Sequence, residues 1–404
     1  MKIRSITVFC ALGYPANRLL LQHLGIFANH ARALFTQEGF EVETLRLALP
    51  PFSEFVNPRD LSAAAQNLSI EAHAEGFEYL SLGPALTTDP EAYPRIPEAL
   101  AKTHGVFFSG MLTTPQGEVS LPAAKSCAEI IAQLAGQSPD GFANLNFCAS
   151  ANVPPYAPFF PAAYAASEPP AFALAMEAAD LAVSVFTAAG SLQEARANLI
   201  EEVEKAAQKL EAAANNLSRM YGYDFKGLDF TLAPFPEVQS SIGGALEALG
   251  LPAFGLAGSL FASAFLTDTL DRARFTRTGF NGLMLPVLED SGLARRAAEG
   301  TLTAQDLLLC SAVCGTGLDV IPLPGDTSAD QLYPLLLDVA ALALRLGKPL
   351  TARLMPISGK KAGDPTEFDF PYFANSRVMP LRAEKTTGLL SNAEIVPLAR
   401  RQPR

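Results

Sequence analysis

The sequence has no apolar run long enough to cross a membrane. Its 404 residues are 49% hydrophobic, yet no run approaches the roughly 20 consecutive apolar residues that a transmembrane helix needs. The opening residues, MKIRSITVF, are typical of a strand. They lack the longer apolar stretch and the small-residue cleavage site of a signal peptide. We therefore expect a soluble cytoplasmic protein.

Basic residues are in the minority. The chain has 30 Lys and Arg against 41 Asp and Glu, which gives a net charge of −11. Nucleic-acid binding needs a basic surface that faces the phosphates, and the basic clusters around residues 272–277 and 360–361 are small. We expect a small-molecule ligand, with neither nucleic acid nor membrane as a partner. The apolar composition is compatible with a homo-oligomer.

Thiols and imidazoles are also scarce. The five cysteines are odd in number and scattered along a long chain, which is typical of reduced thiols rather than of a disulfide framework. Cys310 and Cys314 are four residues apart, but zinc would need two more soft ligands, and the four histidines all lie in the first quarter of the chain. The pattern therefore does not indicate a zinc site.

Apolar strand-like segments alternate with amphipathic helical segments along most of the chain. We expect strands at residues 3–9, 41–48, 79–84, 105–109, 142–149, 228–232, 318–323 and 350–357, among others. Alternation of this kind is typical of a parallel sheet covered by helices. About ten strands fit either one large α/β barrel or two smaller sheets. Residues 152–170 are rich in proline and aromatics, and we interpret them either as a cover for a cavity or as a linker between halves.

Polar groups gather where the apolar runs of residues 281–327 end. The run Leu283–Leu288 is followed directly by Glu289 and Asp290, and Asp319 lies inside the next run. Catalytic groups commonly lie at strand ends in α/β proteins. One carboxylate of the adjacent pair could act as a general base whose pKa the other raises. The alternative is that one of them caps the following helix and the other is solvated.

Four acids are candidate ligands of a divalent cation. Asp229, Glu289, Asp290 and Asp319 lie at or near the ends of three expected strands, and Mg²⁺ or Ca²⁺ would be the natural guest of such an oxygen cluster. A buried carboxylate is costly unless it is paired or bound to metal. The alternative is that each acid binds backbone amides at a turn or pairs with an arginine such as Arg4.

Two further features are candidate site components. Cys314 precedes a glycine turn and is either a catalytic thiol near the reacting centre or a buried structural cysteine. Gly255, Gly258 and Ser259 form a glycine loop that enters a helix. Backbone amides at a helix start can bind phosphate or carboxylate, so the loop predicts either an anion-binding site or a tight turn.

Several pieces between residues 225 and 327 occur together in a known order. They are FKGLDFTLAPFPEVQSSIGGALEALGL, GLAGSLFASAFL, GLMLPVLEDSGL and AVCGTGLDVIPLPGDT. The chain resembles the domain-of-unknown-function family seven-one-one, also called uncharacterised protein family zero-two-one-zero. The resemblance implies a ten-stranded α/β barrel like that of pyruvate formate-lyase and anaerobic ribonucleotide reductase. It implies one domain over residues 1–382, made of halves 1–190 and 191–382, with a tail at 383–404.

The resemblance does not extend to glycyl radical chemistry. Glycyl radical enzymes carry an Arg-Val-x-Gly pattern near the C-terminus, whereas this chain has Arg377-Val378-Met379-Pro380. Proline cannot replace a glycine whose Cα must lose a hydrogen. We therefore expect an enzyme that acts on a small anionic metabolite by acid–base or divalent-metal chemistry. The alternative is a non-catalytic sensor or regulatory protein on a barrel that has lost its radical chemistry.

Overall fold

Five parallel strands from the first part of the chain form the middle of a large mixed sheet. The computed structural model describes residues 1–166 and 169–401. In neighbouring order these strands are β1 (Lys2–Phe9), β2 (Val42–Ala48), β3 (Tyr79–Ala85), β4 (Val106–Met111) and β6 (Phe147–Ala151). Their parallel pairing confirms the expected α/β class. The strand expected at residues 142–149 begins later, because residues Phe142–Asn146 form a 3₁₀ helix.

The second part of the chain adds two strands at each edge of this sheet, running the opposite way. β7 (Ala171–Glu177) lies antiparallel to β1 and parallel to β8 (Asp224–Ala233). At the far edge, β10 (Leu350–Ile357) lies antiparallel to β6 and parallel to β9 (Gly317–Pro324). The described residues thus give a nine-stranded sheet, in the order β8-β7-β1-β2-β3-β4-β6-β10-β9.

The expected tenth strand is not formed as a regular strand. The extended segment 276–287 instead makes two isolated parallel bridges, one from Arg277 to Leu228 of β8 and one from Pro286 to Asp319 of β9. Proline at position 286 has no N–H to donate to a ladder. The segment also passes so close to the loop before β9 that a Cβ on Gly282 would lie 3.0 Å from the Cα of Gly315. A closed ten-stranded barrel is therefore not shown by the hydrogen bonding.

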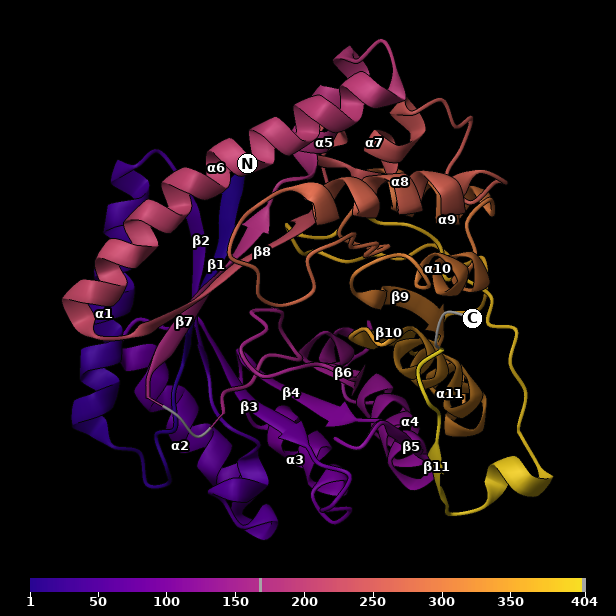
Figure 1. Ribbon diagram of the computed structural model, residues 1–404. Helices are drawn as coiled ribbons and strands as arrows, with labels where there is room; N and C mark the ends of the chain where they lie inside the picture. The colour runs from indigo at the N-terminus through magenta and orange to yellow at the C-terminus, as the bar shows by residue number, and fades with distance from the viewer. Residues whose placement is uncertain (167–168, 402–404) are drawn as a thin grey trace.

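Helices cover the outside of the strands (Figure 1). Those that follow the first five strands are α1 (Arg18–Gln37), α2 (Leu61–Ala74), α3 (Ile96–Ala101) and α4 (Leu121–Ala135). The later ones are α5 (Ala179–Ala188), α6 (Leu192–Tyr221), α7 (Ile242–Ala248), α8 (Ser259–Arg272), α9 (Ser291–Glu299), α10 (Ala304–Cys310) and α11 (Ala329–Leu346). None of the helices in the described residues is both long and apolar enough to cross a membrane.

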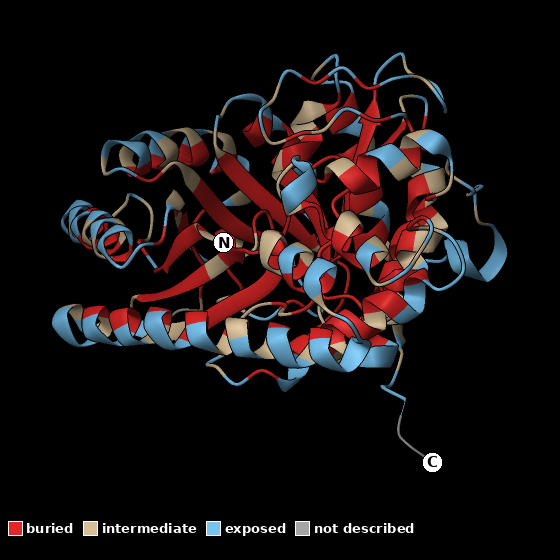
Figure 2. Ribbon diagram, turned by 90° about the horizontal axis from the view of Figure 1, so that it is seen from above, coloured by how far each residue is buried: buried red, intermediate tan, exposed pale blue. Residues whose placement is uncertain are grey.

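The main hydrophobic core lies between the sheet and this helical layer. Helices such as α6 are buried on the side that faces the strands and exposed on the other (Figure 2). Along β1, Ile6 and Val8 belong to this outer core, whereas Phe9 packs with Phe107 and Phe160 in a separate cluster. Because neighbouring side chains of a strand point to opposite faces, the sheet has a second, inner face with its own smaller clusters.

Two irregular segments are held against the sheet. Residues 152–166 run through the middle of the molecule in Figure 1, where the amide of Ala165 donates to the carbonyl of Leu49. The C-terminal segment crosses the outside, where β11 (Ile395–Pro397) pairs with β5 (Glu118–Ser120) and the Tyr333 hydroxyl donates to the Leu390 carbonyl at 2.7 Å. Residues 402–404 of the expected tail lie outside the described residues.

Candidate functional site

A cavity of about 90 Å³ lies on the inner face of the sheet. Its charged lining comes from four strands and from the segment before α9, and consists of Arg4, Glu43, Arg46, Asp229, Glu289 and Arg353. Its apolar wall includes Phe159 and Phe160 of the proline-rich segment, which supports the interpretation of that segment as a cover. Phe370 and Tyr372 line the cavity from the C-terminal part of the chain.

Five charged side chains, three of which line the cavity, form an alternating chain across the inner face. Arg4 of β1 donates to Glu177 of β7 at 3.2 Å and to Glu289 at 2.6 Å. Arg353 of β10 donates to the other oxygen of Glu289 at 2.9 Å and to Asp319 of β9 at 2.5 Å. Both carboxylate oxygens of Glu289 are therefore occupied by guanidinium groups, which is how a carboxylate only 4% exposed is accommodated.

The carboxyl groups at the two ends of this row of ion pairs, Asp319 and Glu177, have raised pKa values. Burial raises the pKa of Asp319, and the nearby Glu289 carboxylate raises it further, while Arg353 opposes the shift. The second carboxylate oxygen of Asp319 is buried and has no hydrogen-bond partner in the part of the chain that the structure describes. At the other end, burial raises the pKa of Glu177 to about 8, against the pull of Arg4. The Glu43 carboxyl group hydrogen-bonds with Glu177 and raises this pKa further.

Arg46 is the one cavity arginine that forms no ion pair within the described residues. Its Nε donates to the Thr44 hydroxyl at 2.9 Å, and its guanidinium group lies over the rings of Tyr79 and Phe160 at 5.5 and 5.2 Å. Burial and the neighbouring positive charge of Arg4 lower the pKa of Arg46 to about 10. A cation held in this way is a natural partner for a bound anion.

Asp229 faces the cavity from β8 but is fixed by a turn. Its two carboxylate oxygens accept hydrogen bonds from the amides of Phe280 and Asn281 at 2.9 and 3.0 Å and from the Thr231 hydroxyl. These donors favour the charged form, while burial raises the pKa of Asp229. This is the alternative in which an acid binds backbone amides at a turn, although the side chain still lines the cavity.

Asp290 lies outside the cavity, unlike its neighbour Glu289. Its carboxylate accepts from Leu293 N at 2.8 Å and so caps α9, and it also accepts from Ser241 Oγ at 2.7 Å and Ile242 N at 2.5 Å at the start of α7. The residue is fully buried. It holds two helix starts together, so we do not carry forward the catalytic and metal roles predicted for it.

Cys314 is also separate from the cavity. It is 1% exposed and belongs to the outer core between sheet and helices, as does Cys310. Its carbonyl oxygen accepts a hydrogen bond from Lys348 Nζ. The neighbouring glycine is explained by the close approach of Gly282 to Gly315 rather than by chemistry at the thiol. The structure thus favours the structural interpretation of Cys314.

The glycine loop is a tight turn in the helical layer. Gly255 and Gly258 have φ angles of 104° and 106°, which favour glycine. The Ser259 hydroxyl accepts from the Gly255 amide at 2.9 Å and donates to the Leu256 carbonyl at 2.7 Å. The polar groups of Ser259 are thus used within the loop, and none of its residues lines the cavity.

The four predicted metal ligands are not brought together. In the part of the chain that the structure describes, no group of three or more His, Cys, Asp and Glu side chains is arranged to hold a metal ion. Glu289 and Asp319 converge, but Arg353 lies between them as a shared cation. The structure therefore corrects the expected acidic cluster to an ion-paired one.

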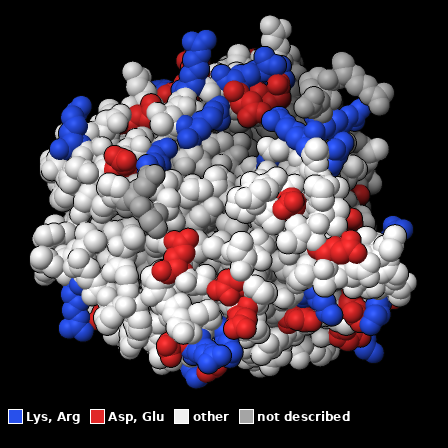
Figure 3. Space-filling view, turned by 60° about the horizontal axis from the view of Figure 1, so that its bottom comes forward, with Lys and Arg blue, Asp and Glu red and all other residues white. Residues whose placement is uncertain are grey.

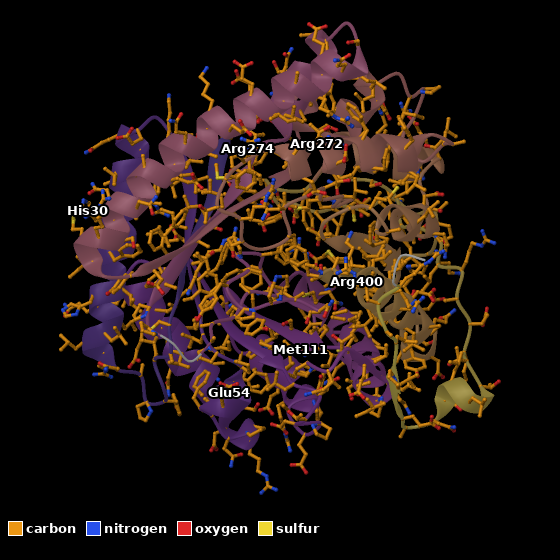
Figure 4. The ribbon with its side chains drawn as sticks, viewed as in Figure 1. His30, Glu54, Met111, Arg272, Arg274 and Arg400 are labelled. Atoms are coloured by element: carbon orange, nitrogen blue, oxygen red, sulfur yellow. The ribbon has the colours of Figure 1, made fainter. Side chains whose placement is uncertain are left out.

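Four site residues were not predicted from the sequence: Glu43, Arg46, Glu177 and Arg353. Each lies in or at the end of an apolar strand. A charged residue in an apolar strand was the one feature of the sequence that could have indicated them as site residues. The cationic clusters noted in the sequence lie elsewhere. Figure 4 labels Arg272 and Arg274 near the end of α8, in the helical layer. On the face shown in Figure 3, basic and acidic side chains form small groups around a broad uncharged area.

Comparison with known proteins identifies the family. The family described as Uncharacterised ACR (DUF711) matches residues 1–375. The chain belongs to this family. It is similar to a UPF0210 protein of Pyrobaculum aerophilum, with 32% identity over 349 residues that cover 81% of this chain and 76% of the relative. The UPF0210 protein of Methanococcoides burtonii is 30% identical over 350 residues, with 82% and 77% covered. That of Oleidesulfovibrio alaskensis is 28% identical over 365 residues, with 85% and 80% covered.

Proposed function

We propose that this protein is a cytoplasmic enzyme that binds a small metabolite through a negatively charged group and acts on it by acid–base chemistry in the inner cavity. The observation that carries the proposal is the state of Arg46. It is the one lining arginine without a carboxylate partner among the described residues, and Tyr79 and Phe160 hold it at the cavity wall. A ligand carboxylate would complete its pairing.

The other two cavity arginines have a supporting role in this proposal. Glu289 joins Arg4 and Arg353 at 2.6 and 2.9 Å and so fixes both guanidinium planes. Fixed charges in a site shielded from water act on developing charge without first having to reorganise. Glu289, predicted as a catalytic base, would thus act as a positioning residue, as would Asp319 through its bond to Arg353.

Proton transfer in this proposal belongs to the carboxyl pair of Glu43 and Glu177. Burial and the neighbouring carboxyl raise the pKa of Glu177 to about 8, so the pair carries a proton near neutral pH. Two carboxyl groups that share a proton are a recurring acid–base device. Glu43 lines the cavity, which would give this proton a path to a ligand held at Arg46.

A binding screen tests the proposal. Acetate, propionate, lactate, pyruvate and inorganic phosphate would each be titrated into the purified protein, with the melting temperature as the readout. At least one acid should raise the melting temperature, because ligand that binds only the folded state stabilises it. Arg46→Met should abolish the effect, while Arg272→Met, which removes an exposed arginine paired with Asp268, should keep it. An unchanged response in Arg46→Met would refute the assignment.

A ligand-binding protein without turnover is the second candidate. It is favoured by Glu289, whose two oxygens are both held by arginines and so are not free to take a proton. Chemical analysis of the bound ligand after long incubation separates the two functions. The enzyme would convert it, whereas a sensor would return it unchanged.

We infer also that the fold is a barrel of the pyruvate formate-lyase type. Five parallel strands make one half, and in the other half the segment 276–287 lies between β8 and β9 with a parallel bridge to each. On this view that segment would stand in the position of a tenth strand. The sequence predicts halves at residues 1–190 and 191–382, but β7 runs antiparallel to β1 and parallel to β8, so the second half would begin with β7. Residues from 383 onward would form a tail.

A further inference from the structure

We propose that the ligand of the inner cavity is a compact zwitterion, a small 2-amino acid whose carboxylate binds Arg46 and whose ammonium group faces Asp229 and Glu43. This inference rests on the proposed function and names its ligand class. Arg46 and Asp229 line the same cavity from β2 and β8. Neither forms an ion pair with any described residue, so the cavity wall offers unpaired charges of both signs.

The charge balance of the wall favours a ligand that is neutral overall. Three arginines and three acids line the cavity. Glu177 and Asp319 lie directly behind them, bonded to Arg4 and Arg353. The acids in and behind the wall are therefore at least as many as the arginines. A ligand with a single negative charge and no positive charge would add a further negative charge to this site. A zwitterion adds none, and burying an uncompensated charge is costly.

The two free charges differ in what they need. Within the described residues, the Thr44 hydroxyl at 2.9 Å is the one hydrogen-bond acceptor of Arg46. The donors at the end of its guanidinium fork are therefore left for a carboxylate. Burial raises the pKa of Asp229, its amide and hydroxyl donors favour the charged form, and it has no positive partner among the described residues. An ammonium group supplies that partner. A hydroxyl group would give a hydrogen bond without the charge.

The cavity volume favours a small ligand. A dry cavity of roughly 150 Å³ accepts benzene, and this cavity measures about 90 Å³. A very short-chain compound matches this volume. A 2-amino acid carries its two charges on neighbouring carbon atoms, and glycine and alanine are the smallest compounds of this kind.

Calorimetric titration with three matched probes tests the inference. L-Alanine carries both charges, propionate lacks the ammonium group, and ethylamine lacks the carboxylate. Near neutral pH, L-alanine should bind at least about 10-fold more tightly than either of the others, because each lacks one partner of a buried charge pair. Propionate or inorganic phosphate binding as tightly as L-alanine would overturn the inference and leave the proposed function standing. If no probe binds, both fail.

A variant gives a second, independent readout. Asp229→Asn should remove most of the preference for L-alanine over propionate, while Asp268→Asn, at an exposed carboxylate of α8, should preserve it. Asp229 also fixes the turn at Phe280 and Asn281, so Asp229→Asn could change the fold as well as the binding. A second variant, Glu43→Gln, is therefore measured beside it, because Glu43 is a half-buried residue of the cavity wall. A preference for L-alanine that is unchanged in both variants would contradict the placement of the ammonium group.

Discussion

Arg4 and Glu289 lie 285 positions apart in the sequence and meet at 2.6 Å inside the protein. The contact joins the first strand of the chain to the residue that precedes α9. Glu289 also links the two arginines of the ion-paired chain, because it binds Arg353 through its other carboxylate oxygen. The organisation of the cavity therefore depends on one carboxylate.

Replacing that carboxylate should be costly. In Glu289→Gln the two buried guanidinium groups lose their shared counter-charge, and we expect the free energy of unfolding to fall by about 3–5 kcal/mol. Urea unfolding measures it. Glu299→Gln, at a half-exposed carboxylate paired with Arg296, serves as the control and should change stability by less than about 1 kcal/mol. Equal losses of stability in the two variants would show that Glu289 is not the shared counter-charge of Arg4 and Arg353.

Asp290 should matter for folding and not for ligand binding. Asp290→Ala removes the cap of α9 and leaves buried amides of Ile242 and Leu293 without an acceptor. We expect it to lose about 2–4 kcal/mol of stability. The folded fraction of the variant, titrated with the best ligand, should keep an affinity close to that of the unaltered protein. A selective loss of affinity without loss of stability would instead restore Asp290 to the site.

Glu177 should make stability depend on pH in a defined direction. Its pKa is raised from the ordinary 4.5 to about 8, so between these values the folded state holds a proton that the unfolded state has lost. Stability from this group is therefore present at low pH and is lost as pH rises towards 8. Glu177→Gln should flatten this fall. Melting temperatures of both proteins across that window measure it, and parallel curves would show that Glu177 does not hold the proton.

Cys314 should be dispensable for binding. It is 1% exposed in the outer core and does not line the cavity, so Cys314→Ala should cost stability through a small void, at most about 1–2 kcal/mol, and leave ligand affinity unchanged. A thiol reagent should modify Cys314 in the native protein only as fast as the protein opens. Rapid modification, or loss of turnover without loss of stability, would return Cys314 to the candidate catalytic residues.

The sequence was informative about elements and less so about which side chains meet. The alternation of strands and helices predicted the α/β class, and strands β1 and β9 lie where their apolar runs indicated. Glu289 and Asp290 illustrate the limit. Glu289 lies in a turn in which its amide donates to the Pro286 carbonyl at 3.1 Å, whereas Asp290 is the N-cap of α9, so one side chain faces the cavity and the other caps a helix. Adjacency in the sequence does not say which.

The candidate site was partly predictable for the same reason. Arg4 as a partner for one of the acids was a correct alternative, because a buried carboxylate needs a cation or donors. The described residues do not form the expected metal cluster, because Arg353, on another strand, fills the space between two of the acids. Arg46 gave no signal beyond a charge in an apolar strand. Its importance comes from a missing partner, which only the three-dimensional arrangement reveals.

A crystal structure of the protein soaked with L-alanine tests the central claim most directly. The account predicts ligand density in the inner cavity, with the carboxylate on Arg46 and the ammonium group towards Asp229. An empty cavity at a saturating concentration, or a ligand bound elsewhere with Arg46 unengaged, would contradict it.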